Sequence, residues 1–189
     1  METYDKFRAR HAEKKQVGNF TPAELAALDK KLPADIINFL KEEGRAGYSN
    51  NTLWTTHPAE FHDILSDWGL DGNKCYAFIR TAFGGCIYYS KKNFYSFDSL
   101  SGTINNLNDD VYTLMNVYLT FDFLLHDTWH LQYLETRIDL PAILPDEVYG
   151  LVPALPFGGS LETSKFEVVK MREHLAFLAE LFANKVQKL

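Results

Sequence analysis

The chain has 189 residues, of which 46% are hydrophobic and 23% are charged, and its formal net charge is −6. Its 14 Phe, 10 Tyr and 3 Trp residues exclude a disordered chain, because disordered segments are poor in aromatic side chains. No stretch reaches the roughly 18 consecutive apolar residues of a membrane-spanning helix, and the N-terminus lacks the apolar stretch of a signal peptide. The sequence therefore predicts a folded, soluble, cytoplasmic protein.

The first third of the chain is predicted to be helical. Thr21-Pro22-Ala23-Glu24 is a capping-box pattern with proline at the first helical position. A second helix is expected to begin near Pro33 and end at Gly44, and a third, short helix to open at His57-Pro58. The residues that these two helices are expected to bury are Ile36, Ile37, Leu40, Phe61, Ile64 and Leu65.

From Lys74 onward the pattern changes to short aromatic and β-branched runs. The runs CYAFIR, GCIYYS and NFYSFDS are separated by Gly84-Gly85 and Lys91-Lys92, and a turn at Ser101-Gly102 leads to GTINNL. Such runs, separated by turn residues, are typical of neighbouring antiparallel strands. The sequence therefore predicts an antiparallel meander of three or four strands.

The two cysteines fall in this meander. If Gly84-Gly85 turns a hairpin, Phe83 pairs with Cys86, and Cys75 lies opposite Phe94. Two thiols without a Cys-x-x-Cys spacing favour neither a disulfide framework nor a redox motif. We expect two buried, reduced thiols that act as small hydrophobic side chains.

After the meander the helical period returns. Asn108 is a candidate N-cap, and helical segments are expected over 109–119 and 121–135. The Pro- and Gly-rich stretch at 139–160 is predicted to form a strand and turns. Ser164-Lys165-Phe166-Glu167 resembles a second capping box that starts a C-terminal helix. The apolar stripe expected on that helix consists of Val168, Met171, Leu175, Leu178 and Phe182.

Helices on both sides of one block of strands predict the α+β class. The expected architecture is an antiparallel β meander flanked by helices, in a compact single unit with two sub-domains. Because no linker-like stretch occurs near residue 108, the two parts are expected to share one continuous core.

The sharpest candidate for chemistry is a run of three side chains, each four residues apart. Asp122, His126 and His130 would form one stripe on a helix, and two histidines at i and i+4 can share a metal ion. The zinc-protease motif needs Glu directly after the first His, however, and Asp127 occupies that place. The stripe also faces away from the apolar residues Phe121, Leu124, Leu125 and Leu131. We therefore expect a solvated polar face, with a small metal-dependent hydrolase as the alternative function.

The remaining motifs favour structural roles. His57 and His62 are five residues apart and share no helix face, and His174 is expected to be a packed histidine with one hydrogen bond. The sequence has no Gly-x-Ser-x-Gly elbow, and its glycine pairs lack the spacing of phosphate or dinucleotide loops. The sequence thus predicts neither a catalytic set nor a cofactor or metal site, and it favours a non-enzyme.

The charge is unevenly distributed. Residues 1–31 carry a net charge of +2 and residues 32–189 a net charge of −8. Within 93–164, ten carboxylates face the single cation Arg137. An acidic body repels phosphate backbones, which disfavours direct nucleic-acid binding, and it accelerates docking of a basic protein surface. The alternative interpretation is that the acidic surface only keeps the protein soluble.

The C-terminal part resembles a known family. Tyr149-Gly150, Val152-Pro153-Ala154, Gly158-Gly159 and His174-Leu175 resemble the C-terminal domain of type VI secretion DNase-immunity proteins. Upstream, LPADIINFLKEEG, LW and AFIRTAFGGCIYY are similar to the GAD-like domain found before it. The two resemblances predict a GAD-like domain over 2–107 and an immunity-protein C-terminal domain over 108–184.

The resemblance implies a protein that binds and neutralises a co-produced nuclease toxin in the bacterial cytoplasm, with no catalytic residue to assign. Such a partner has a basic DNA-binding surface, so carboxylates on loops are the expected contacts, with aromatic anchors among them. The predicted partner-binding residues are Asp98, Asp109, Asp110, Asp146, Glu147, Tyr95 and Tyr112. The competing account is that Asp109 and Asp110 only stabilise a helix N-terminus. A generic regulatory adaptor is a third possible function.

Overall fold

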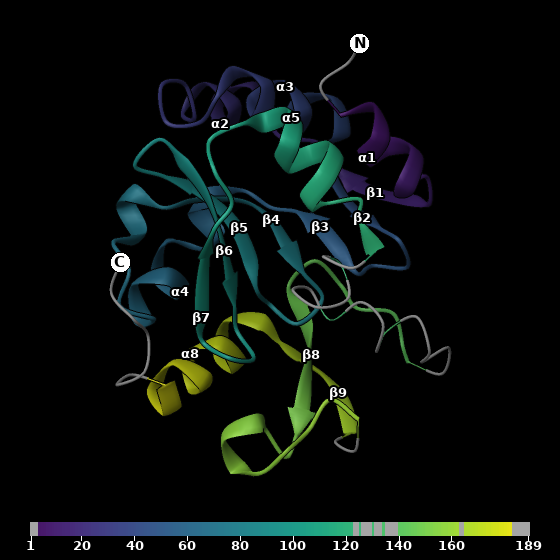
Figure 1. Cartoon of the computed structure of the whole chain (residues 1–189), viewed down its shortest axis with the longest axis vertical. Coiled ribbons are helices and arrows are strands. Elements are labelled where there is room, and N and C mark those ends of the chain that lie inside the picture. Colours follow the sequence, from purple (N-terminus) through teal and green to yellow (C-terminus); the bar gives the residue numbers. More distant parts are fainter. Residues whose placement is uncertain are drawn as a thin grey trace.

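The computed structural model describes residues 4–122, 125, 130, 134, 140–162 and 165–182. Within these residues the centre is a seven-stranded antiparallel sheet, in which each strand pairs with the next along the chain (Figure 1). Its strands are β1 (Lys14–Gly18), β2 (Arg45–Tyr48), β3 (Leu53–Thr55), β4 (Tyr76–Thr81), β5 (Cys86–Ser90), β6 (Asn93–Asp98) and β7 (Thr103–Asn106). A separate two-stranded ribbon contains β8 (Glu147–Val152) and β9 (Lys165–Lys170).

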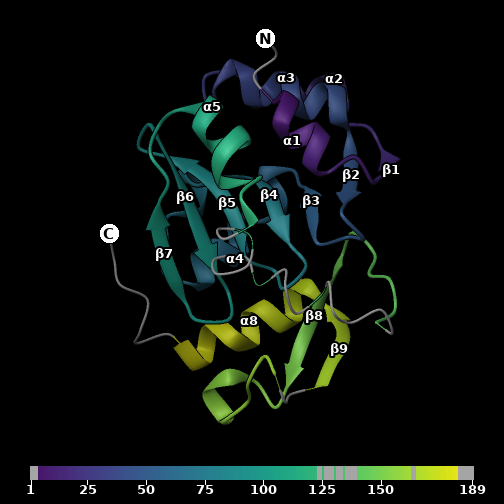
Figure 2. The same cartoon turned by 45° about the vertical axis from the view of Figure 1, so that its right-hand side comes forward.

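Helices cover both faces of the sheet. Figures 1 and 2 show α1 (Asp5–Arg10), α2 (Pro22–Ala26), α3 (Ala34–Glu43) and α5 (Val111–Thr113) together at the top. The helices α4 (His62–Asp67) and α8 (Met171–Phe182) lie lower, and α8 is beside the β8–β9 ribbon. Short 3-10 turns are η1 (Pro58–Glu60), η2 (Gly72–Lys74) and η4 (Leu155–Phe157).

The sheet separates two apolar clusters. Successive strand residues point to opposite faces, so Ile87 joins the cluster under α1, α3 and α5, whereas Tyr88 joins the cluster under α4 and α8. Both clusters also contain residues of the C-terminal part, such as Tyr149 in the first and Leu175 in the second. The α+β class predicted from the sequence is confirmed.

The helices α2 and α3 begin where the sequence predicts, whereas α1 was not predicted. The third predicted helix is divided: His57 precedes the 3-10 turn η1, and α4 begins only at His62. Thr21 accepts a hydrogen bond from the Glu24 backbone N–H at 3.2 Å, and Glu24 accepts one from the Thr21 backbone N–H at 2.7 Å. These hydrogen bonds hold the pKa of Glu24 at about 2. The helix α3 follows Pro33 and ends at Gly44, whose φ of 66° suits glycine.

Replacing Thr21 with Ala should lower the free energy of unfolding by about 1 kcal/mol, because the first turn of α2 loses its side-chain acceptor. Urea unfolding of both proteins measures the change. Thr21→Ser keeps the acceptor and should retain most of the stability. Equal losses for Ala and Ser would show that the methyl group, and not the cap, is responsible.

The meander is confirmed, but the sheet extends beyond it. The four strands β4–β7 are those predicted, whereas β1, β2 and β3 were missed. β1 has the sequence KKQVG and is mostly exposed, and β3 has only three residues. Neither shows the apolar alternation on which strand prediction depends. These strands are held by pairing, with Gly47 opposite Trp54 and Trp54 opposite Arg80.

The predicted register at Gly84-Gly85 is wrong. Cys86 pairs with Arg80, and the Thr81 backbone N–H donates to the Gly85 carbonyl at 2.7 Å, so Phe83 lies inside the loop. Position 85 requires glycine in this loop, because a Cβ there would lie 2.6 Å from the Phe97 carbonyl oxygen.

The positions of the two cysteines follow from this register. The prediction that Cys75 lies opposite Phe94 is wrong, because Phe94 pairs with Tyr89 and Cys75 precedes β4. Both cysteines are free and buried, as expected, and burial raises the pKa of each thiol.

The predicted start of the C-terminal helix is also wrong. Residues Lys165–Lys170 form β9, and α8 begins only at Met171; Ser164 lies outside the described residues. The β-branched Val168 and Val169 favour a strand, and β8 supplies a partner along all six residues. Of the predicted stripe, Met171, Leu175, Leu178 and Phe182 are buried on α8, and Val168 belongs to the ribbon.

The helix after the meander has a different N-cap from the one predicted. Asp110, and not Asn108, is the N-cap of α5, because its carboxylate accepts a hydrogen bond from the Thr113 N–H at 2.7 Å. The helix continues as a π-helical turn over Leu114–Tyr118. The predicted helix 121–135 lies mostly outside the described residues, as do Leu124 and Leu131. Leu125 is buried as expected, but Phe121 is 56% exposed.

A buried cation ties the C-terminal part to the sheet. Arg80 of β4 donates to the carbonyls of Leu144 and Pro145, and its guanidinium lies 5.0 Å from the Trp54 ring centroid. Burial lowers the pKa of Arg80 to about 9, so it remains charged at neutral pH. On the other face, the Trp68 indole N–H donates to the Leu175 carbonyl.

None of the helices that the structure describes has the length and apolar character of a membrane-spanning segment.

Candidate functional site

Asp98, the first predicted contact residue, is occupied within its own turn. Its carboxylate accepts hydrogen bonds from the Leu100 N–H, the Ser101 hydroxyl and the His130 ring. Burial raises the pKa of Asp98, but the hydrogen bonds, led by that from His130, outweigh it and lower the pKa overall. Its side chain is only 15% exposed, which leaves little of the carboxylate for a partner.

Asp109 and Asp110 lie at the other end of β7 from Asp98. Asp98 pairs with Thr103 at the start of β7, whereas the Asn108 carbonyl accepts from the Phe94 N–H beside the end of that strand. Four strand residues place the two ends on the order of 13 Å apart. The three carboxylates therefore do not form the single cluster that their positions in the sequence suggest.

The segment from Asp109 to Tyr112 is open to solvent. Asp109 and Asp110 are exposed, and neither forms an ion pair with a residue that the structure describes. Hydrogen bonds from the side chain and N–H of Thr113 lower the pKa of Asp110, which keeps it ionised. Tyr112 is 41% exposed on the same turn. Two carboxylates and one aromatic ring thus lie within four residues.

Asp146 and Glu147 share a cation. The Lys170 ammonium lies 2.8 Å from the Asp146 carboxylate and 3.1 Å from that of Glu147. Glu147 is 16% exposed and also accepts a hydrogen bond from the Leu144 N–H, whereas Asp146 is 66% exposed. This pair mainly joins β8 to β9, and Lys170 neutralises part of its charge.

Tyr95, the predicted aromatic anchor on β6, is buried, with 8% of its surface exposed. Its ring stacks on that of Tyr88, with centroids 5.3 Å apart and planes at 15°. The two tyrosines are direct cross-strand partners on β5 and β6. Their edges line a cavity of about 590 Å³, which sequence reasoning missed.

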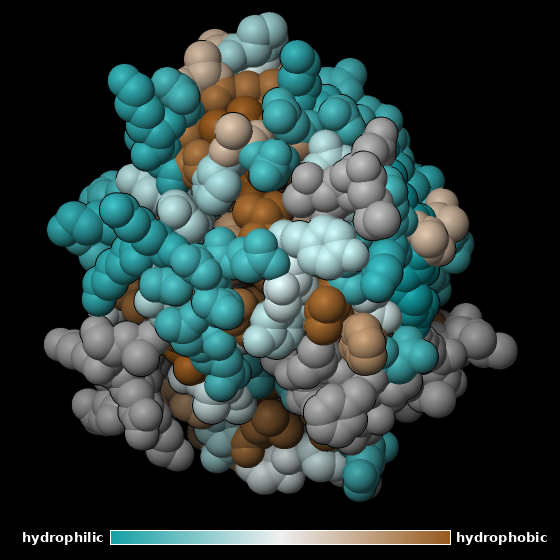
Figure 3. All heavy atoms as spheres, turned by 45° about the horizontal axis from the view of Figure 1, so that its top comes forward, coloured by the Kyte–Doolittle hydropathy of each residue, from teal (hydrophilic) through white to brown (hydrophobic). Residues whose placement is uncertain are grey.

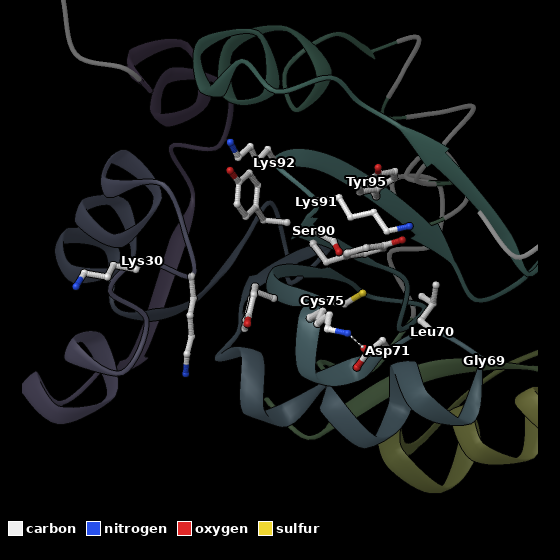
Figure 4. A pocket seen from close by; sticks show the side chains of 14 residues that line it. Lys30, Gly69, Leu70, Asp71, Cys75, Ser90, Lys91, Lys92 and Tyr95 are labelled. Carbon is white, nitrogen blue, oxygen red and sulfur yellow. Dashed lines mark ion pairs between the residues drawn. The ribbon is translucent and has the colours of Figure 1, made fainter.

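This cavity, here called the lysine pocket, is lined by three separate parts of the chain (Figure 4). They are the turn after α2, the connection from α4 to β4, and the β5–β6 hairpin. The lining is strongly basic and aromatic. Its lysines are Lys30, Lys31, Lys74, Lys91 and Lys92, and its tyrosines are Tyr76, Tyr88, Tyr89 and Tyr95.

The charge of the lysine pocket is largely uncompensated. Asp71 is the single carboxylate among the lining residues, and it forms an ion pair with Lys74 at 2.7 Å (Figure 4). The other four lysines form no ion pair with any residue that the structure describes. An anion is therefore the complementary occupant. The signal in the sequence was Lys91-Lys92 at a hairpin turn, which we interpreted only as a turn.

The predicted metal stripe lacks its helical geometry. Asp122 is exposed and its carboxylate lies 2.9 Å from the Arg10 guanidinium. His130 has a φ of 58°, which is not helical, and its ring contacts Asp98 at 3.4 Å. His126 lies outside the described residues. The four-residue spacing therefore does not place Asp122 and His130 on one helix face.

The other histidines are structural in the described residues. His57 caps η1 by accepting a hydrogen bond from the Ala59 N–H, and burial lowers the pKa of His62. Their Nε2 atoms have no hydrogen-bond partner in the described part of the chain. His174 packs against Gly150, where a Cβ would lie 2.9 Å from its ring. The hydrogen bond predicted for His174 is not formed with any described residue.

The surface over α1–α3 and α5 is largely hydrophilic, with small apolar areas between polar side chains (Figure 3). The large hydrophobic side chains exposed elsewhere are scattered along the chain, at positions such as Val17, Phe121 and Phe157. A partner that docks on the pictured face would meet mostly polar and charged groups.

Comparison with known proteins gives both family and fold. The model of the GAD-like domain matches residues 2–98, just over half of the chain, and the model "T6SS immunity protein Tdi1, C-terminal" matches residues 130–182. The crystal structure of Atu4351 from Agrobacterium tumefaciens is similar with a TM-score of 0.75, over 93% of this chain and 88% of that one. The two sequences are 11% identical, so this likeness concerns the fold alone. Among curated proteins, none matches this chain.

The two family matches occur in the order predicted from the sequence, and they support a type VI secretion immunity protein. The chain belongs to the GAD-like domain family, and its C-terminal segment matches the model of a type VI secretion immunity protein.

Proposed function

We propose that this chain binds a DNA-cleaving type VI effector in the cytoplasm of the producing bacterium and neutralises it by covering its active site. The observation that carries the proposal is the match of residues 130–182 to the immunity-protein family. Immunity against a secreted toxin requires a stable complex with that toxin. The acidic balance of the chain favours a nuclease as the toxin, because a nuclease must present cations to phosphates.

Among the predicted contact residues, the segment Asp109–Tyr112 suits this role best. Its two carboxylates are exposed and form no ion pair with a described residue, so their field reaches an approaching basic surface. Tyr112 supplies an amphipathic ring beside them, of the kind enriched at the centres of interfaces. Asp98, Glu147 and Tyr95 are mostly buried, so they offer less surface to a partner than this segment does.

Co-expression of this chain with the nuclease encoded beside it should restore growth, and the purified proteins should form a complex that no longer cleaves DNA. Growth without any measurable complex would point to an indirect role and overturn the proposal. A complex whose nuclease still cleaves DNA would contradict coverage of the active site.

Reversing the charge of the 109–110 pair, from −2 to +1, should slow association. In the variant Asp109→Lys with Asp110→Asn, the asparagine keeps the cap on Thr113, so α5 stays intact. The association rate with the toxin should fall about tenfold and depend less on ionic strength, because steering by these carboxylates is lost. Stopped-flow mixing at several salt concentrations measures both.

The matched control is Asp67→Lys with Glu180→Gln, which changes the net charge by the same amount on α4 and α8. Both residues are exposed, so this variant should fold normally and associate at a rate close to that of the wild type. Equal slowing of both variants would mean that net charge alone steers the encounter. An unchanged rate for the 109–110 variant would restrict the two aspartates to helix capping.

A further inference from the structure

The lysine pocket has the size and the lining of a small-molecule site. Its volume of about 590 Å³ lies in the range of ligand pockets, which are roughly 300–1,000 Å³. Four of its lysines have no ion pair in the described chain, although the protein as a whole has a net charge of −6. A local excess of cations on an acidic protein needs a cause other than overall composition.

The backbone supplies one argument. Eight non-glycine residues of the described chain have positive φ; three of them are lysines, and all three line the lysine pocket. They are Lys30 (62°), Lys91 (48°) and Lys92 (65°). A left-handed conformation is unfavourable for a side chain such as lysine, and Gly or Asn normally takes such positions.

The β5–β6 turn contains two consecutive lysines in this unfavourable backbone conformation. Ser90 pairs with Asn93, so Lys91 and Lys92 form a two-residue hairpin loop with positive φ at both positions. Such type I′ turns strongly prefer Asn-Gly. Two lysines here strain the turn, and both line the pocket, with side chains that extend in different directions from the hairpin (Figure 4). Strained backbone of this kind concentrates at functional sites.

The tyrosines indicate which chemical group the ligand carries in addition to its anionic group. Tyr76 and Tyr89 are cross-strand partners, both partly exposed on one face of the sheet, whereas the buried pair Tyr88–Tyr95 lies on the opposite face. Inorganic phosphate alone would leave these rings uncovered. A ligand with phosphates for the lysines and a flat ring for the tyrosines satisfies both parts of the lining. An extended nucleic acid would meet the acidic remainder of the surface, which repels it.

We propose that the lysine pocket binds a free nucleotide, with its phosphates at Lys31 and Lys92 and its base against Tyr76 and Tyr89. This site is independent of the toxin, and its test uses this protein alone. Calorimetric titration with ADP should show one site per chain, and the affinity should fall as salt rises. Pyrophosphate and adenosine, which each supply half of the ligand, should bind at least tenfold more weakly than ADP.

The decisive variant is Lys91→Asn with Lys92→Gly. It installs the residues that the turn prefers, so Tm should rise by about 2–4 °C, while the affinity for ADP should fall at least tenfold. A purely structural role for the lysines predicts no such opposition between stability and binding. The control Lys15→Gln with Lys41→Gln removes the same charge on β1 and α3 and should leave the affinity within twofold of that of the wild type.

Several results would overturn this proposal. They are no binding of ADP at millimolar concentration, equal affinities for ADP and pyrophosphate, and full ADP affinity in the stabilised Lys91→Asn, Lys92→Gly variant. Tighter binding of a single-stranded oligonucleotide than of ADP would replace the nucleotide with a nucleic acid and would likewise contradict it.

Discussion

Truncating Leu175 to alanine should lower the free energy of unfolding by about 2–5 kcal/mol. The side chain is fully buried on α8 and meets the tight loop at Gly84, where an added Cβ would lie 2.8 Å from its Cδ2. The backbone carbonyl of Leu175 also accepts the Trp68 indole hydrogen bond, which limits how far α8 can shift to fill the cavity. A site that cannot collapse loses the most stability.

Because Leu175 contacts the loop between β4 and β5, its loss should weaken the whole fold and not only α8. Urea unfolding followed by Trp fluorescence and by circular dichroism should therefore give one coincident, shifted transition. Phe177→Ala is the control, since Phe177 is 46% exposed on the same helix and its truncation should cost less than about 1 kcal/mol. Similar losses for the two variants would mean that α8 is held by something other than its buried face.

The elements that could be predicted from sequence are those that local interactions determine. The capping box at Thr21 needs only four consecutive residues, and the structure forms both of its hydrogen bonds. The pattern at 164–167 looked equivalent but failed, because β8 offers residues 165–170 a strand partner that no local window shows. Tertiary pairing thus overrides a local helix signal.

The candidate site divides in the same way. Counting charges located the acidic segment 93–164, but it could not distinguish Asp98, which is enclosed by its turn, from the exposed Asp109. The lysine pocket was not predictable by spacing, since it joins residues near 30, 70 and 90 that meet only in the folded chain. The domain boundary at 107/108 and the partner-binding residues remain predictions.

Lowering the pH from 6.5 to 4 should remove about 3 kcal/mol of stability through His11 alone. His11 is 2% exposed, and burial lowers its pKa to about 4. Its Nε2 lies 2.7 Å from the Leu119 carbonyl, which can only accept, so Nε2–H donates; Nδ1 then accepts from the Ser49 hydroxyl at 2.7 Å. Both nitrogens of the neutral ring thus form hydrogen bonds. In the charged ring Nδ1 would carry a proton and could no longer accept from Ser49, and the positive charge would be buried near Arg10.

The direction of this pH effect follows from the protonation of His11 in the folded and in the unfolded chain. Between pH 6.5 and 4 the unfolded chain binds a proton at His11 and the folded chain does not, so stability is complete above pH 6.5 and decreases as the pH falls through this window. Carboxylates also titrate there, and only a comparison with a variant isolates the histidine. In His11→Gln, stability measured from pH 7 to 4 should decline by about 3 kcal/mol less than in the wild type, whatever its stability at pH 7.

The loss of stability on protonation of His11 is expected to begin in one part of the fold. His11 follows α1 and reaches Leu119, directly after the π-helical turn, so it joins the N-terminal helix to the segment that begins with the exposed aspartates. Below pH 5, hydrogen exchange should therefore accelerate first in α1 and over 114–119, while β4–β6 remain protected. Parallel pH profiles for the wild type and His11→Gln would mean that the ring already carries its proton in the folded protein.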